Sequence, residues 1–254
     1  MISRLLVFAF ALLAGAGDVL AQQDVQIQAR DGVTVHGDFF AAPGDPRGTI
    51  LLFHQARSNR GEYATITPDL VKAGYNVLVI DQRAGGAAWS RLNLTAQGAA
   101  QEANQSGETY YLKALADLEA ALDYAAKRPT RPIIAWGSGY SASLVFLLAA
   151  AHPDLIGGVL AFSAAENFAT TSVHNAAAKV KCPVFISSSP DPGEVSDAKK
   201  LLDAVPEGTK TQLIPQRGLS GSPALRREAN PRGAAEYWTA VNAFLASIGK
   251  KPAA

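Results

Sequence analysis

Short apolar strands alternate with helix-forming segments along most of this chain, and this alternation restricts the fold more than any other feature. From residue 48 onward, the runs Thr49 to Phe53, Tyr75 to Ile80 and Ile133 to Trp136 are each followed by a helical pattern. Strands that are apolar on both faces and alternate with helices form a parallel sheet covered by helices on both sides. The sequence therefore predicts an α/β fold.

The segment before residue 48 has a different pattern. Val25 to Ala29 and Val33 to Ala41 flank the turn Arg30-Asp31-Gly32, which predicts an antiparallel hairpin. Later strands are expected at Gly158 to Phe162, Pro183 to Ser187 and Thr209 to Ile214. Helices are expected at Tyr63 to Ala73 and Val195 to Val205, and Ser163 to Lys181 is expected to be irregular. We therefore predict a mostly parallel sheet of about eight strands with an antiparallel N-terminal hairpin and helices on both faces.

Residues 1–21 have the pattern of a signal peptide. Arg4 is followed by the apolar stretch Leu5 to Leu13, and Val19-Leu20-Ala21 fits a small-residue cleavage site. The apolar stretch is too short to span a bilayer. We expect an exported protein, periplasmic or secreted, with residues 22–254 forming one domain and no stable membrane insertion after cleavage.

Composition excludes several partners and cofactors. The formal net charge is +1 and no basic block occurs, which argues against nucleic acid or an anionic membrane surface. One cysteine and four scattered histidines give no metal-ligand spacing. We predict no metal and no other cofactor, and the sequence leaves the oligomeric state open.

The segment Trp136-Gly137-Ser138-Gly139-Tyr140-Ser141-Ala142-Ser143 follows a strand and opens an apolar helix. Strand-to-helix bends of the pattern G-x-S-x-G carry a nucleophilic serine at the centre. Here Gly139 takes the central position, because Gly137 directly follows the strand and small residues follow at 141 and 142. Counting from Ser141 instead would place Leu144 where a small residue is needed, although Ser141 stays the alternative nucleophile.

The other members of a Ser-acid-His triad belong on later loops. After Pro183 to Ser187 the chain offers Asp191 as the first candidate acid and Glu194 as the second, while a simple turn role for Asp191 is equally consistent. The loop after Thr209 to Ile214 contains no histidine, and no histidine follows His174. The base of a triad is therefore missing.

On the runs Leu52 to Gln55, Val79 to Arg83, Trp136 to Ala142 and Gly218 to Ser222, the chain resembles the dienelactone-hydrolase-like and esterase-like bacterial members of the α/β-hydrolase superfamily. The resemblance implies a three-layer α/β-hydrolase fold. It places Gly139 at the nucleophile position and Ser220 at the histidine position. It also implies an oxyanion hole formed by the backbone amides of Gln55 (or Ala56) and Tyr140.

Two main hypotheses follow, and the sequence leaves open whether the protein is an enzyme. In the first, the chain is a pseudoenzyme that binds a small carbonyl or carboxylate ligand or a partner. In the second, it is an active carboxylic-ester hydrolase that uses Ser141 either with His174, from a possible lid at about residues 163–181, or with a water relay. A third hypothesis is an envelope interaction module without a pocket.

Overall fold

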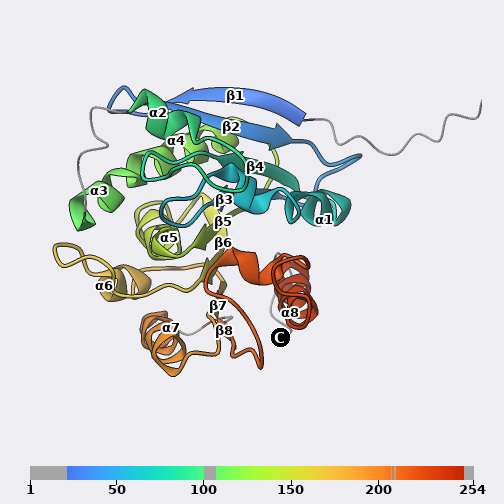
Figure 1. Ribbon diagram of the computed structural model, residues 1–254, viewed down its shortest axis with the longest axis vertical. Coiled ribbons are helices and arrows are strands. Elements are labelled where there is room, and N and C mark those ends of the chain that lie inside the picture. Colours follow the sequence, from blue (N-terminus) through green and yellow to red (C-terminus); the bar gives the residue numbers. More distant parts are fainter. Residues whose placement is uncertain (1–21, 100–106, 207, 209, 249–254) are drawn as a thin grey trace, which may run out of the picture.

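The computed structural model describes residues 22–99, 107–206, 208 and 210–248. Its strands form one sheet in the order β1-β2-β4-β3-β5-β6-β7-β8 (Figure 1). The strand bounds are β1 Gln22–Gln28, β2 Thr34–Phe40, β3 Thr49–Phe53, β4 Asn76–Ile80, β5 Ile133–Ser138, β6 Ile156–Phe162, β7 Val184–Ser187 and β8 Lys210–Leu213.

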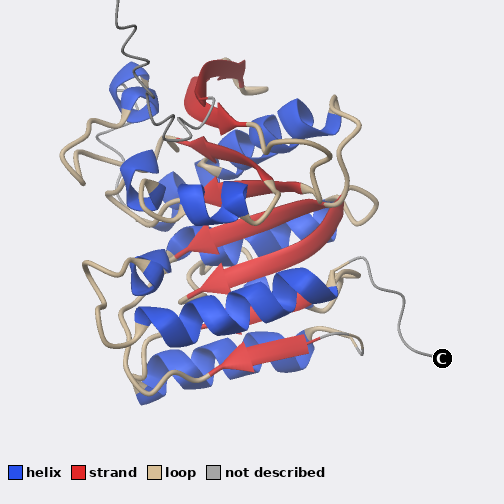
Figure 2. Cartoon of the chain, turned by 90° about the vertical axis from the view of Figure 1, so that its right-hand side faces the viewer, coloured by secondary structure: helices blue, strands red, loops and turns tan. Residues whose placement is uncertain are grey.

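The predicted fold class is confirmed. Strand β2 pairs antiparallel with β1 and with β4, whereas the pairs from β4 through β8 are parallel. Every residue of β3, β4 and β5 is buried, as expected for central strands covered on both faces. Figure 2 shows the twist of the sheet, with helices in front of it and behind it.

Two hydrophobic cores lie on opposite faces of the sheet. One contains apolar side chains of α4, α5 and α7, and the other contains those of α1 and α8; the two sets of helices lie on opposite sides in Figure 1. The helices are α1 Thr67–Lys72, α2 Leu94–Gly98, α3 Glu108–Lys113, α4 Leu115–Ala126, α5 Tyr140–Ala151, α6 Val173–Ala177, α7 Pro192–Ala204 and α8 Ala234–Ser247, with 3-10 turns η1 Arg60–Tyr63 and η2 Ser222–Leu225.

Some element boundaries differ from the sequence prediction. The helix expected from Tyr63 to Ala73 begins only at Thr67, as α1, because Tyr63 ends the 3-10 turn η1 and a turn follows it. The segment 163–181, which the sequence shows as irregular, contains α6 packed beside α5 and α7. Helix α7 begins at Pro192, earlier than expected, because Asp191 caps its first turn and proline is well suited to the first helical position.

The predicted signal peptide, residues 1–21, lies outside the described residues. Within the described part of the chain, no helix combines the length and apolarity needed to cross a bilayer.

Candidate functional site at the bend after β5

Gly139 alone forms the bend between β5 and α5. Its backbone angles are φ 59° and ψ −125°, a conformation that glycine adopts readily and that costs an L-amino acid free energy. A Cβ atom at this position would lie 3.1 Å from Gln55 Cβ. The residue at the bend between the strand and the helix therefore has no hydroxyl group.

Close packing surrounds this bend. A Cβ on Gly137 would lie 2.2 Å from the Ser141 carbonyl oxygen, so only glycine fits at that position. Ser141 and Ala142 are both fully buried where α5 approaches the sheet. The spacing of small residues matches an elbow centred on position 139.

Ser141 lies inside the protein rather than at the bend. Its side chain is fully buried, and its hydroxyl donates to the His54 carbonyl oxygen at 2.7 Å. Ser141 Oγ also accepts a hydrogen bond from Gln82 Nε2 at 2.7 Å. Both contacts hold Ser141 in the packing between α5 and the loops after β3 and β4.

The two candidate oxyanion-hole amides differ in their surroundings. Gln55 donates its backbone N–H to Glu62 Oε2 at 3.1 Å. Tyr140 is the first residue of α5, where a backbone N–H has no acceptor within its own helix. The structure thus supplies Gln55 with an internal acceptor and leaves the Tyr140 amide at the positive end of a helix.

Glu62 is a site residue that sequence reasoning missed. Its side chain is fully buried, and burial raises the pKa of its carboxyl to about 7, although the nearby Ser138, Ser58 and the Gln55 N–H each act to lower it. Its Oε1 atom has no hydrogen-bond partner. A glutamate beside an arginine and a glycine in a polar loop carries no sequence signal of burial.

Of the two candidate acids, the structure brings Glu194 and not Asp191 to Ser220. Asp191 Oδ1 accepts the backbone N–H groups of Gly193 and Glu194 at 2.9 and 3.1 Å, which is N-cap geometry. Ser220 Oγ donates to Glu194 Oε1 at 2.5 Å. The sequence allowed Asp191 either a catalytic role or a simple turn role, and its contacts are those of a turn residue that caps α7.

Ser163, which directly follows β6, also contacts Glu194 and the loop that carries Ser220. Its hydroxyl donates to Glu194 Oε2 at 2.7 Å and accepts the Gly221 N–H at 2.9 Å. Partial burial alone would raise the pKa of the Glu194 carboxyl. The hydrogen bonds from Ser220 and Ser163 instead hold this pKa below its usual value. The loop that carries Ser220 is therefore tied to the sheet by hydroxyl groups.

In the described contacts, no histidine side chain is hydrogen-bonded to Ser141, Ser220 or Glu194. His54 is fully buried, and burial lowers its pKa to about 4. Its Nε2 accepts the Gln82 N–H at 2.9 Å, so Nδ1 carries the proton and donates to the Gln55 carbonyl oxygen at 2.8 Å. His174 is exposed on α6, and both hydrogen bonds of Ser141 go to other groups.

Comparison with known proteins identifies the family. Residues 44–211 match the family model described as serine aminopeptidase, S33. The chain belongs to this α/β-hydrolase family. No curated protein matches it in sequence.

Solved structures show the same α/β-hydrolase fold. A dienelactone hydrolase from Anabaena variabilis has a TM-score of 0.70 at 14% identity, with 90% of this chain and 98% of that chain covered. A carboxyl esterase from Bacillus coagulans has a TM-score of 0.68 at 13% identity, with 90% and 99% covered. An esterase from Pyrococcus furiosus has a TM-score of 0.64 at 17% identity, with 91% and 92% covered.

Proposed function

We propose that this α/β-hydrolase is a non-hydrolytic member that binds a small carbonyl or carboxylate compound at the bend after β5. The observation that carries the proposal is Gly139, which adopts φ 59° at the bend and offers no hydroxyl to attack a substrate. A second feature supports the proposal: Ser220, which the family resemblance assigns to the histidine position, donates a hydrogen bond to Glu194. Without nucleophile and base, turnover in such triads falls by roughly 10⁴ to 10⁶.

The ligand class follows from the groups at the bend. Helix α5 has 12 residues and begins directly after Gly139, so its first amides favour a carbonyl or carboxylate oxygen.

We further propose that the protein acts in the periplasm or outside the cell after removal of residues 1–21. Intact-mass measurement of the protein from the periplasm tests the export proposal, since the expected mature chain begins at Gln22.

Ester turnover and active-site labelling test the absence of hydrolysis. The mature protein is incubated with p-nitrophenyl acetate and with a fluorophosphonate probe, and an active esterase of the same fold serves as a positive control. We expect no turnover above the buffer rate and no labelled serine in the folded protein. Covalent labelling of any serine, mapped by mass spectrometry, would refute the proposal.

The second candidate function is ester hydrolysis through Ser141, which family membership favours. It requires Ser141 to give up its two internal hydrogen bonds and to meet a base. If the wild-type protein turns over p-nitrophenyl acetate and Ser141→Ala abolishes that turnover, this candidate replaces the first.

Reconstruction of the triad tests the assignment of positions. The double variant Gly139→Ser with Ser220→His would place a hydroxyl at the bend and an imidazole beside Glu194. We expect p-nitrophenyl acetate hydrolysis at least tenfold above wild type in the double variant only, and its loss when Glu194→Gln is added. Equal activity in either single variant would show that the positions are assigned wrongly.

A further inference from the structure

The backbone is strained in several loops that follow the central strands. In the described part of the chain, four residues other than glycine have a positive φ: Arg57 at 58°, Trp89 at 54°, Ser90 at 55° and Ser163 at 60°. This conformation is unfavourable for an L-residue. It persists where the surrounding structure enforces it, and such residues gather at ligand sites.

All four residues lie at one edge of the sheet. Strands β4, β3, β5 and β6 are neighbours in that order and run parallel, so their carboxyl ends share an edge. Trp89 and Ser90 follow β4, Arg57 follows β3 and Ser163 follows β6. Gly139, with its φ of 59°, follows β5 between them. Open α/β sheets bind ligands outside the carboxyl ends of their strands, so these loops form the surroundings of the bend.

Trp89 and Ser90 form the tip of a two-residue hairpin. Ala88 and Arg91 exchange backbone hydrogen bonds at 3.1 and 2.9 Å. A positive φ at both central residues is the mark of a type I′ turn, for which Asn-Gly is preferred. The buried Asn59 side chain holds the turn by donating to the carbonyl oxygens of Ala88 and Arg91, each at 2.9 Å. The protein thus keeps a tryptophan in an unfavourable conformation at the end of a fixed turn.

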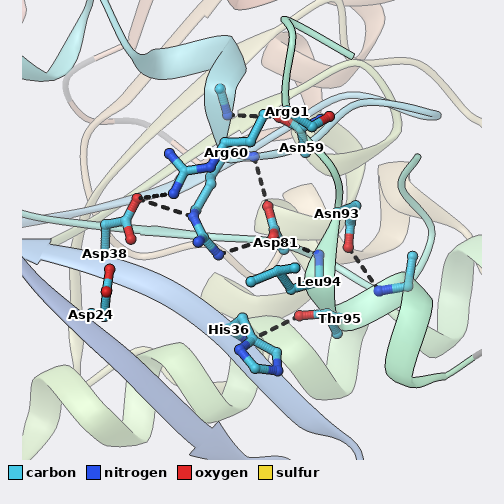
Figure 3. A network of polar contacts seen from close by, with 12 residues as sticks. Asp24, His36, Asp38, Asn59, Arg60, Asp81, Arg91, Asn93, Leu94 and Thr95 are labelled. Atoms are coloured by element: carbon cyan, nitrogen blue, oxygen red, sulfur yellow. Dashed lines mark hydrogen bonds and ion pairs between the residues drawn. The ribbon is translucent and has the colours of Figure 1, made fainter. Parts of the chain in front are cut away.

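The chain that follows this turn is also anchored. Asp81 accepts the Leu94 N–H at 2.9 Å, and Thr95 Oγ1 accepts the His36 N–H at 2.9 Å (Figure 3). The loop therefore has its position before a ligand arrives, which lowers the entropy cost of binding.

The indole of Trp89 is held in place without being enclosed. Its Nε1–H donates to Ser58 Oγ at 2.9 Å, and the guanidinium carbon of Arg226 lies 4.1 Å from the ring centroid. Arg226 is itself held by the Gly61 carbonyl oxygen at 3.1 Å. Trp89 is still 38% exposed. Because Arg226 covers one ring face, the opposite face is the one open to a ligand.

Exposed apolar side chains are concentrated on the same loops. Five large apolar side chains are exposed among the described residues, and three of them, Trp89, Leu92 and Leu94, belong to the loop after β4. A fourth, Leu219, adjoins Ser220. Exposed apolar surface beside a candidate site favours a ligand that has an apolar part.

We propose that Trp89 determines which ligand the bend accepts: a carboxylate that carries an aromatic ring, with the ring stacked on the free face of the indole. Stacked aromatic pairs add affinity beyond that of area burial. Strands β4 and β5 are two places apart in the sheet, which at a strand spacing of about 4.8 Å sets roughly 10 Å between the ring and the carboxylate. The inference rests on the function proposed for the bend.

Calorimetric titration of the mature protein with three probes of matched chain length tests it. 5-Phenylvalerate has both the ring and the carboxylate, valerate lacks the ring, and 5-phenyl-1-pentanol lacks the carboxylate. We expect 5-phenylvalerate to bind about tenfold more tightly than either of the others.

The other outcomes separate this inference from the proposed function. Equal affinity for valerate and 5-phenylvalerate would overturn the role of Trp89 and leave the function proposed for the bend standing. Equal affinity for 5-phenyl-1-pentanol and 5-phenylvalerate would refute carboxylate recognition, and with it both proposals. No saturable binding of any probe would also refute both.

Substitutions at Trp89 locate the ring of the ligand. Trp89→Ala removes the stacking surface, so affinity for 5-phenylvalerate should fall about tenfold while affinity for valerate stays unchanged. Trp89→Phe keeps an aromatic face and should retain most of the affinity. Ile214→Ala is the control, because it removes an exposed apolar side chain after β8, five strands from β4. Undiminished binding of 5-phenylvalerate to folded Trp89→Ala would overturn the proposal.

A measurement on the wild-type protein covers the case in which Trp89→Ala fails to fold. The chain has three tryptophans, and Trp136 and Trp238 are buried, so iodide should quench chiefly the fluorescence of Trp89. Saturating 5-phenylvalerate should shield the indole and reduce this quenching, whereas valerate should not. Unchanged quenching at saturating 5-phenylvalerate would refute stacking on Trp89.

Discussion

The buried carboxyl of Glu62 makes the stability of this protein depend on pH in a predictable direction. An unfolded glutamate ionises with its ordinary pKa of 4.5, whereas burial raises the pKa of Glu62 in the folded protein to about 7. Between these two values the folded state holds a proton that the unfolded state releases. Stability contributed by the protonated group is therefore complete below pH 4.5 and is lost as the pH rises through 7.

The size of the effect follows from the separation of the two pKa values. A difference of one pKa unit corresponds to about 1.4 kcal/mol, so Glu62 lowers the free energy of unfolding by about 3 kcal/mol between pH 4.5 and neutral pH. In Glu62→Gln the side chain keeps an oxygen that can accept the Gln55 N–H, but it has no ionisable proton. The free energy of unfolding of the variant should therefore not contain this decrease between pH 4.5 and neutral pH.

Urea denaturation followed by tryptophan fluorescence at pH 4.5 to 8 measures the effect. We expect Glu62→Gln to become more stable relative to wild type as the pH rises, and the difference between the two proteins to change by about 3 kcal/mol over that range. Asp203→Asn, which alters a carboxylate that is 62% exposed, serves as the control. A constant difference between wild type and Glu62→Gln across the range would refute the assignment of a raised pKa to Glu62.

Three further substitutions have expected effects on stability. Gly139→Ala should lower the free energy of unfolding by about 1 to 2 kcal/mol, because its positive φ is unfavourable for an L-residue and its Cβ would press on Gln55; an unchanged urea midpoint would contradict this. Asp191→Ala should cost about 1 kcal/mol through loss of the α7 cap, and a similar loss with Asp191→Asn would count against a capping role, since asparagine also caps. Asp117→Ala should cost about 3 kcal/mol because it removes the fully buried one of the two carboxylates that pair with Arg83 and leaves only the partly exposed Asp31, and thermal denaturation should show a clearly lowered midpoint.

The fold was predictable because its signals are local and repeated. Apolar runs such as Thr49 to Phe53 mark strands buried on both faces, and the turn Arg30-Asp31-Gly32 marks the hairpin. The residues at which the helices begin were harder to predict from the sequence. Asp191 shows why, since the same Pro-rich turn is compatible with a catalytic carboxylate and with a cap, and only the direction of its side chain separates the two.

The candidate site was only partly predictable for the same reason. The absence of a serine at 139 and of a histidine near 220 can be read directly from the sequence. The pairing of Gln55 with Glu62 cannot, because it joins residues of two different turns through burial rather than through a motif. The link from Ser163 to Glu194 likewise depends on β6 and β7 lying side by side in the sheet.

The bend at Gly139 has a consequence for how this chain can change over time. Glycine adopts φ 59° without the steric cost that a serine would carry there. If the proposed assignment of positions holds, a serine at 139 alone would add that cost and bring no ester hydrolysis, because position 220 would still lack an imidazole. Under that proposal, neither substitution brings activity when it occurs singly, so the conformation of this turn disfavours the gain of hydrolysis through successive single substitutions.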